Sequence, residues 1–205
     1  MKLQLATQFA NDFLQKLMPA CIRGEIVGSV KRADKEEVHD IEILLIAKDE
    51  KPVPEFGRPQ EIYTSKLQKV LADLEYGGYL RQAARKADGD RYKKRAIIGS
   101  GELNEFCLDL FIVRPETWGL QNVIRTGPSL FSHAFVTNQN QQIFDRTTGN
   151  KYAGLLPNHL EYIRGETVIK NRKTGEVLLL PEEQDAIAVL GHGWIEPAQR
   201  RFLVK

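Results

Sequence analysis

Apolar residues recur at steps of three and four near the start of the chain, which is the spacing of a helix with one buried face. This spacing predicts a helix over residues 5–18, which Pro19 ends because proline cannot continue a helix. A similar stripe over residues 65–76 predicts a second helix, and a Gly-Gly pair follows it. The stripe of the first helix consists of Leu5, Phe9, Phe13, Leu14 and Leu17.

Short apolar runs bounded by turn residues predict strands between and after these helices. The clearest run is DIEILLIA at residues 40–47, and a proline-rich segment at residues 48–63 predicts a loop after it. Alternation of such strands with helices favours helices packed on a mixed sheet of about four or five strands. The other predicted strands are residues 23–27, 96–98 and 106–113.

The pattern changes beyond Pro115, where residues 118–136 are helical in spacing but are interrupted by Thr126-Gly127-Pro128. Short elements and turns follow, with a further helix predicted over residues 182–190. We therefore expect an α+β protein with two domains. The first, residues 1–117, carries the mixed sheet, and residues 118–205 form a smaller C-terminal α+β subdomain.

The composition is that of an ordinary globular protein, with 42% hydrophobic and 27% charged residues. No stretch is long and apolar enough to span a bilayer, and the alternating first twenty residues do not match a signal peptide. The two cysteines match no zinc spacing. These features predict a cytoplasmic protein without a membrane partner, and we expect a monomer.

Charge is concentrated in one basic segment, although the net charge is only +2. Between residues 81 and 95, seven cations face two acidic residues, Asp88 and Asp90. Such a cluster can neutralise phosphates and bind DNA or RNA, although a solvated loop has the same composition. The cations are Arg81, Arg85, Lys86, Arg91, Lys93, Lys94 and Arg95.

Two carboxylates stand side by side in the strand predicted over residues 40–47. Side chains at positions i and i+2 of a strand share a face, so Asp40 and Glu42 lie together while Ile41 and Ile43 face the core. Paired oxygen ligands of this kind suit Mg²⁺ or Mn²⁺. An acidic pair on an exposed strand surface is the alternative interpretation of these two residues alone.

Neighbouring residues strengthen the metal interpretation. Gly28 and Ser29 end the preceding strand with backbone N–H groups and a hydroxyl that can hold phosphate, and Lys31 and Arg32 follow them. Asp109 lies inside the apolar run FCLDLFIV, where an unpaired buried carboxylate would be costly. Together these residues describe a two-metal phosphoryl-transfer site.

Four segments resemble the DNA polymerase beta-like (family X) branch of the nucleotidyltransferases. GSVKRADKEEVHDIEILL resembles the palm signature, and LDLF at residues 108–111 resembles the strand with the third metal ligand. TGPSLF at residues 126–131 is similar to the Thr-Gly-Ser nucleotide-binding turn, and LLPEEQDAIAVLGHGWIEPAQR to the polymerase ending. The resemblance covers nearly all of the chain and implies a nucleotidyltransferase palm.

The resemblance also implies roles for individual residues. Asp40, Glu42 and Asp109 would hold two Mg²⁺ or Mn²⁺ ions and catalyse transfer from a nucleoside triphosphate to a DNA or RNA primer end. The nucleotide-binding residues would be Gly28, Ser29, Lys31, Arg32, Thr126, Gly127 and Ser132, with Ser132 reaching the base edge.

The sequence also departs from the family pattern. Glu42 replaces the second aspartate, and Cys107 stands where a basic residue usually orients the third one. Ile124-Arg125 replaces the aromatic pair ahead of Thr126-Gly127. Two alternatives to a polymerase therefore remain, namely a nucleotidyltransferase that modifies a transfer RNA, a protein or a small molecule, and an inactive binding module with the same fold.

Overall fold

The computed structural model describes residues 1–48, 66–83, 88–89, 91–99, 101 and 105–204. The chain forms two compact units, one of Met1–Ile26 with Lys35–Val113 and one of Val27–Asp34 with Arg114–Lys205. The segment around Gly28 therefore belongs to the second unit, although it lies early in the sequence. Most of the loop predicted over residues 48–63 lies outside the described residues.

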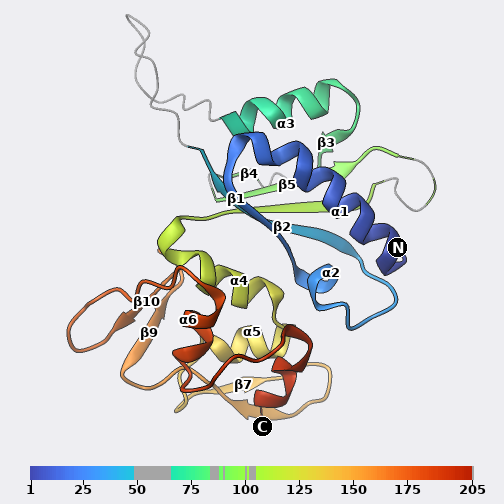
Figure 1. Cartoon of the computed structure of the whole chain (residues 1–205). Coiled ribbons are helices and arrows are strands. Elements are labelled where there is room, and N and C mark those ends of the chain that lie inside the picture. Colours follow the sequence, from blue (N-terminus) through green and yellow to red (C-terminus); the bar gives the residue numbers. More distant parts are fainter. Residues whose placement is uncertain (49–65, 84–87, 90, 100, 102–104, 205) are drawn as a thin grey trace, which may run out of the picture. The chain divides into compact units, whose positions relative to one another are not determined.

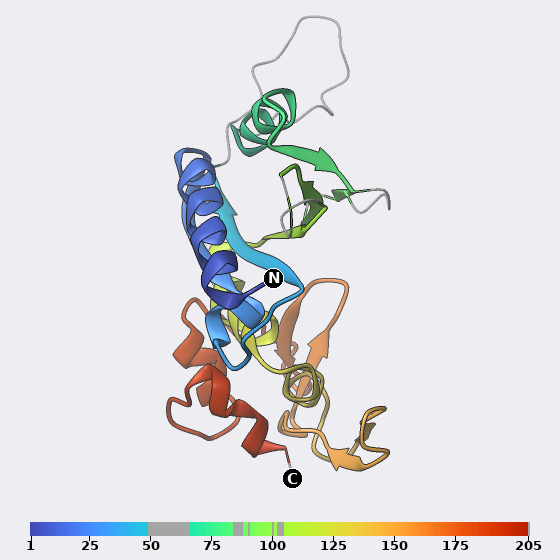
Figure 2. The same cartoon turned by 90° about the vertical axis from the view of Figure 1, so that its right-hand side faces the viewer.

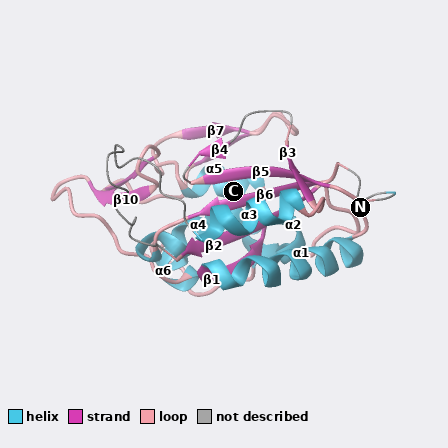
Figure 3. Cartoon of the chain, turned by 90° about the horizontal axis from the view of Figure 1, so that it is seen from above, coloured by secondary structure: helices cyan, strands magenta, loops and turns pink. Residues whose placement is uncertain are grey.

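The first unit contains a mixed sheet with the strand order β1 (Cys21–Val27), β2 (Asp40–Ala47), β6 (Cys107–Ile112), β5 (Tyr92–Ile97) and β3 (Leu80–Gln82). A short strand, β4 (Asp88–Gly89), pairs with β5 beside this series. β2 runs parallel to β6, whereas β5 runs antiparallel to it, and Figure 3 shows these three strands side by side. The α+β class with a mixed sheet is thus confirmed.

Helix α1 (Leu3–Leu17) packs against β2 and α3 (Lys66–Tyr76), as Figure 1 shows. A Cβ atom on Gly24 of β1 would lie 2.8 Å from Leu14 of α1 and 3.1 Å from Leu45 of β2, so these groups share one face of the sheet. Alternation along β2 then places Ile41 and Ile43 on this covered face, where both are fully buried. Asp40 and Glu42 consequently lie on the opposite face.

Most predicted elements of the first unit are confirmed, with one informative difference. The predicted helices correspond to α1 and α3, and the strand predicted over residues 40–47 is β2. Strand β5, however, begins at Tyr92, four residues before the predicted start. Its first four residues are Tyr-Lys-Lys-Arg, and two of them, Lys93 and Arg95, are buried. Because the buried positions carry cationic rather than apolar side chains, the sequence lacks the alternation of apolar and polar residues that predicts a strand.

The second unit begins with the short helix α2 (Gly28–Arg32), which follows directly on β1. Gly28 has a φ of 69°, a conformation that glycine adopts without strain, and it lets the chain pass from β1 directly into a helical turn. Ala33, at φ 51°, ends the helix in the left-handed region. Gly28 and Ser29, which were expected to end the preceding strand, are therefore the first two residues of α2.

The rest of the second unit combines helices with two hairpins. Helix α4 (Trp118–Thr126) ends where the sequence predicts a break, and α5 (Ser129–Phe135) begins after Pro128. Figure 2 shows the hairpins on one side of α5 and the C-terminal segment on the other. The remaining elements are the 3₁₀ helix η3 (Pro115–Thr117), the hairpins β7 (Gln142–Phe144) with β8 (Lys151–Ala153) and β9 (Leu160–Ile163) with β10 (Val168–Asn171), α6 (Glu183–Ala188) and η4 (Pro197–Leu203).

The helices and hairpins of the second unit enclose a hydrophobic core of their own. Phe131 and Phe135 of α5 are fully buried at its centre, together with Ile169 of β10 and Ile187 of α6. Within the described ranges, no helix has the length and apolar character needed to cross a membrane.

Gly119 allows α4 to approach the start of α6 closely. Its N–H donates to the Leu180 carbonyl over 2.8 Å, and a Cβ atom here would overlap the Glu182 carbonyl. We expect Gly119→Ala to lower the free energy of unfolding by at least about 2 kcal/mol in a urea titration, because the two backbones must separate. Helix propensity alone would make the alanine variant more stable by about 1 kcal/mol. A decrease in the free energy of unfolding would therefore be due to the clash.

Gly165→Ala is the matched control for this substitution. A Cβ atom on Gly165 would meet no atom of the described residues within 4 Å, and we expect a change within about 0.5 kcal/mol. Equal effects of the two substitutions would contradict the close approach of α4 and α6.

Candidate functional site

The three predicted carboxylates lie on one face of the sheet. Glu42 of β2 is paired with Asp109 of β6, and Asp109 is paired on its other side with Lys94 of β5. Residues paired across neighbouring strands project to the same face, so these side chains form a row across three strands. Asp40, two residues before Glu42, pairs with Cys107 and therefore shares this face.

Asp109 is the most deeply placed of the three carboxylates, with 7% of its surface exposed. The Tyr92 hydroxyl donates to its Oδ1 over 2.9 Å, and the Lys94 ammonium lies 3.2 Å from Oδ1 and 3.4 Å from Oδ2. The Tyr92 ring stacks on Phe111, with ring centroids 5.2 Å apart. Asp109 is thus buried together with a neutral donor and a cation, as a buried carboxylate requires.

These contacts shift the pKa values of both donors. Burial, followed by the hydrogen bond and the charge of Asp109, raises the pKa of Tyr92 to about 12. Burial alone would lower the pKa of the Lys94 ammonium, but the hydrogen bond and charge of Asp109 outweigh it and raise this pKa above its ordinary value. Both groups therefore remain protonated at neutral pH and can donate to Asp109.

The carboxylate face fits a hard cation in its donor chemistry, since carboxylate oxygens are the ligands that Mg²⁺ and Mn²⁺ prefer. Among the described residues, no three His, Cys, Asp or Glu side chains converge into a group that could hold a metal ion. Asp40 and Glu42 also have contacts within the protein. The carboxylate face, formed by Asp40, Glu42 and Asp109, thus supplies suitable ligands, but these side chains would have to move closer together to bind one ion.

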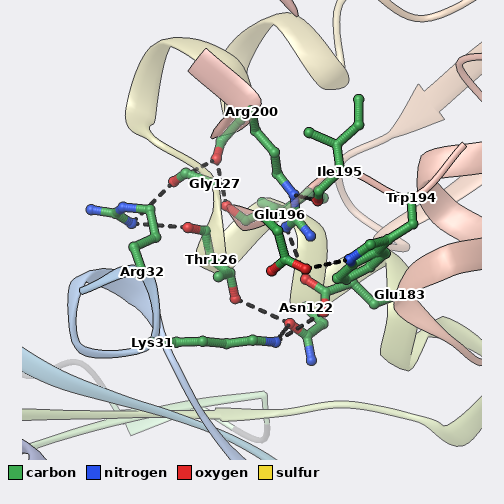
Figure 4. A network of polar contacts seen from close by, with 12 residues as sticks. Lys31, Arg32, Asn122, Thr126, Gly127, Glu183, Trp194, Ile195, Glu196 and Arg200 are labelled. Atoms are coloured by element: carbon green, nitrogen blue, oxygen red, sulfur yellow. Dashed lines mark hydrogen bonds and ion pairs between the residues drawn. The ribbon is translucent and has the colours of Figure 1, made fainter. Parts of the chain in front are cut away.

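In the second unit, Lys31 of α2 takes part in an internal ion pair. Its ammonium donates to Asn122 Oδ1 and to Glu183 Oε2, both over 2.9 Å, and Figure 4 shows the three side chains meeting. The Thr126 hydroxyl donates to the same Asn122 oxygen over 3.0 Å. Helices α2, α4 and α6 are joined by these contacts.

Arg200 of η4 completes this network from its other side. Its side chain is fully buried and donates through one terminal nitrogen to Glu183 Oε1 over 2.8 Å and through Nε to the Ile195 carbonyl over 3.2 Å. Glu183 therefore holds Lys31 on one oxygen and Arg200 on the other. Trp194 lies under the guanidinium at 5.3 Å, and its indole N–H donates to Glu196.

Arg32 contacts the turn between α4 and α5. Its guanidinium donates to the carbonyl of Thr126 over 2.9 Å and to that of Gly127 over 3.4 Å, and its Nε lies 3.4 Å from Asp34. The expected nucleotide-binding residues Arg32, Thr126 and Gly127 are thus brought together (Figure 4). They meet through backbone carbonyls, because the Thr126 side chain is fully buried.

The Ser132 hydroxyl makes two hydrogen bonds within the protein. The hydroxyl donates to the Ile124 carbonyl over 2.6 Å and to the Gly127 carbonyl over 3.2 Å. Both are carbonyls at the end of α4, which lack partners within the helix. Ser132 therefore caps the end of α4, and its expected contact with a base edge remains a prediction.

Ser29 differs from its neighbours in α2 because its hydroxyl oxygen is buried and makes no hydrogen bond within the described part of the chain. A buried hydroxyl without a partner is unusual in a folded protein. It is one of the residues that the sequence assigned to phosphate binding.

Three cations of the basic segment at residues 81–95 form ion pairs with acidic residues of the protein. Arg81 pairs with Glu105, Lys94 with Asp109, and Arg95 with Glu75 of α3 over 2.5 Å. Arg85 and Lys86 lie outside the described residues. Three of the seven cations thus have acidic partners, and Arg81 and Lys94 remain partly exposed.

Several residues that contact Asp109 in the first unit or Lys31 in the second were not identified from the sequence. Tyr92, Asn122 and Glu183 had no predicted role, and Lys94 was expected to face solvent or nucleic acid. Alternation in the segment YKKRAI was the available signal for β5, since it places Tyr92 and Lys94 on one face. No local signal indicates the contact between Asn122 and Lys31, since these two residues lie far apart in the sequence.

In comparisons with known proteins, no family model matches this sequence and no curated protein matches it. The resemblance to the polymerase beta-like nucleotidyltransferases rests on the four motifs and remains a prediction.

The shared carboxylate of Glu183 should be critical for stability. Glu183→Ala would leave Arg200 buried without a counter-ion and Lys31 with one partner fewer, and we expect a loss of about 3–5 kcal/mol in the free energy of unfolding. Glu161→Ala is the control, since Glu161 is half-exposed and lies 3.9 Å from Arg172. Chemical denaturation of both variants measures the difference, and a loss under 1 kcal/mol for Glu183→Ala would contradict the shared role.

Proposed function

We propose that this protein is a metal-dependent nucleotidyltransferase that transfers a nucleotidyl group from a nucleoside triphosphate to a nucleic-acid 3′ end. The observation that carries the proposal is the alignment of Glu42 with Asp109, together with Asp40 on the same face. Three carboxylates on one face of a sheet supply the charge that a phosphoryl-transfer site needs for its metal ions. The four motifs of the polymerase beta-like family support the same assignment.

Asp40, Glu42 and Asp109 would hold Mg²⁺ or Mn²⁺. When bound, such ions neutralise phosphate charge and make an acceptor hydroxyl more nucleophilic. The contribution of the chain itself is orientation. Tyr92, held by stacking on Phe111, fixes one Asp109 oxygen, and Lys94 balances the charge of that carboxylate.

Ser29 and Arg32 are the residues we assign to the triphosphate, with backbone contacts from Gly28 and a lesser contribution from Lys31. The buried Ser29 hydroxyl supports this assignment, because it has no hydrogen-bond partner among the described residues and a phosphate oxygen would supply an acceptor. Arg32 links α2 to the Thr126-Gly127 turn, where we place the sugar.

The proposed reaction exchanges one bond at the α-phosphorus for another. The acceptor hydroxyl oxygen bonds to the α-phosphorus and the bond to the bridging oxygen of the β-phosphate breaks. Pyrophosphate then leaves, and the hydroxyl proton passes to water or to a basic group. Positioning and charge neutralisation supply most of the catalysis in such transfers.

A second candidate function is nucleotidyl transfer to an acceptor other than a polymer end, such as a protein or a small molecule. The ion pairs of Arg81, Lys94 and Arg95 favour it, because a nucleic-acid backbone would have to compete with acidic side chains for these cations. Long acceptors usually depend on several phosphate contacts for affinity.

The metal-binding role predicts that Asp40→Asn, Glu42→Gln and Asp109→Asn each reduce nucleotidyl transfer by at least about a hundredfold while the protein stays folded. Each substitution keeps the size of the side chain and removes the charge that a divalent ion needs. Incorporation of labelled nucleotide into a primer, with Mg²⁺ or Mn²⁺, measures the loss. Glu161→Gln, on the β9 strand, is the control and should retain full activity, whereas full activity of Asp109→Asn would refute its assigned role.

The acceptor class is decided by the same assay with different acceptors. A polymerase should extend a primer and respond to a template, and its binding should weaken as salt rises. Transfer to protein or small molecules without primer extension would instead establish the second candidate function.

A further inference from the structure

The pairing of Lys94 with Asp109 has a consequence for metal binding that rests on the proposed function. Lys94 places its ammonium near both oxygens of Asp109, at 3.2 and 3.4 Å. These distances are longer than the 2.7–2.9 Å that is usual for charge-assisted hydrogen bonds. Lys94 thus compensates the charge of Asp109 without a tight, directional bond.

The two donors to Asp109 differ in their freedom to move. The ring of Tyr92 is held against Phe111, and its hydroxyl contacts Oδ1 at 2.9 Å. Lys94 has a flexible stem, and 29% of its side chain is exposed, so its ammonium can withdraw into water. Tyr92 would therefore continue to orient the carboxylate after Lys94 has left it.

We propose that Lys94 is the resident counter-cation of Asp109 and that a divalent ion binds this carboxylate by displacing the Lys94 ammonium. Lys94 then acts as a positioning residue that sets the metal affinity of the carboxylate face. Without the ion, it compensates a carboxylate that is 7% exposed. With the ion, the ammonium and the metal repel each other, and the metal takes over the compensation.

Displacement predicts opposite effects for two substitutions at this position. Lys94→Met removes the competing charge, and we expect Mn²⁺ to bind about threefold to tenfold more tightly. Lys94→Arg replaces a mobile point charge with a planar group that holds both oxygens of a carboxylate, and we expect Mn²⁺ to bind more weakly than in the natural protein. A merely structural role of Lys94 would not produce effects of opposite sign.

The experiment measures free Mn²⁺ by electron paramagnetic resonance while the full chain is titrated, with circular dichroism to verify folding. Lys170→Met is the matched control, since Lys170 is paired with Glu166 in the second unit and its loss changes the net charge equally. Its Mn²⁺ affinity should equal that of the natural protein. Asp109→Asn should weaken Mn²⁺ binding at least about tenfold.

The outcomes separate this inference from the proposed function. If Asp40→Asn and Asp109→Asn bind Mn²⁺ as the natural protein does, the carboxylates are not metal ligands and the proposed function fails. If these variants lose Mn²⁺ while Lys94→Met binds it equally or more weakly, displacement is overturned and the proposed function stands. Should Lys94→Met not fold, tighter binding by Lys94→Arg than by the natural protein would overturn displacement.

Discussion

The structure of the first unit depends on the parallel pairing of β2 with β6 in one register. Ile41, Ile43 and Leu110 fill the face that is covered by helices, and all three are fully buried. A slip of one residue would send these side chains to the other face and bring the carboxylates into the core. Hydrophobic burial therefore fixes the position of Glu42 opposite Asp109, and the chemistry of the carboxylate face follows from the packing of the other face.

This register buries the charge of Asp109, and in each unit an ion pair compensates a buried charge. Asp109 is almost buried, and Lys94 and Tyr92 compensate it from the neighbouring strand. In the second unit the buried ion is the cation Arg200, and Glu183 compensates it while also holding Lys31. A buried pair contributes little net stability, but removing one partner is costly because the other remains buried. Both ion pairs are therefore important for folding, and the pair of Asp109 with Lys94 also belongs to the proposed metal site.

The sequence was sufficient to predict elements whose apolar residues recur at regular spacing. It was insufficient to predict contacts that depend on the pairing of strands. Helix α1 and strand β2 follow from their apolar periods, and the common face of Asp40 and Glu42 follows from alternation along one strand. Nothing local, however, reveals that Lys94 lies opposite Asp109, because that register joins strands separated by a turn. The capping contact of Ser132 could not be predicted for a similar reason, since its hydroxyl bonds to the end of a preceding helix.

Asp109 has structural contacts in addition to its proposed metal-binding role, and this affects how a loss of activity should be interpreted. Replacing Asp109 by alanine would remove the acceptor for Tyr92 and the partner of Lys94 together, so a lower activity could reflect altered packing around β5. Asparagine keeps an oxygen that can accept from Tyr92 and removes only the charge. Loss of metal binding in that variant, with Tyr92 still hydrogen-bonded, can be attributed to the missing charge. The amide therefore separates the electrostatic role of Asp109 from its structural one, which alanine cannot do.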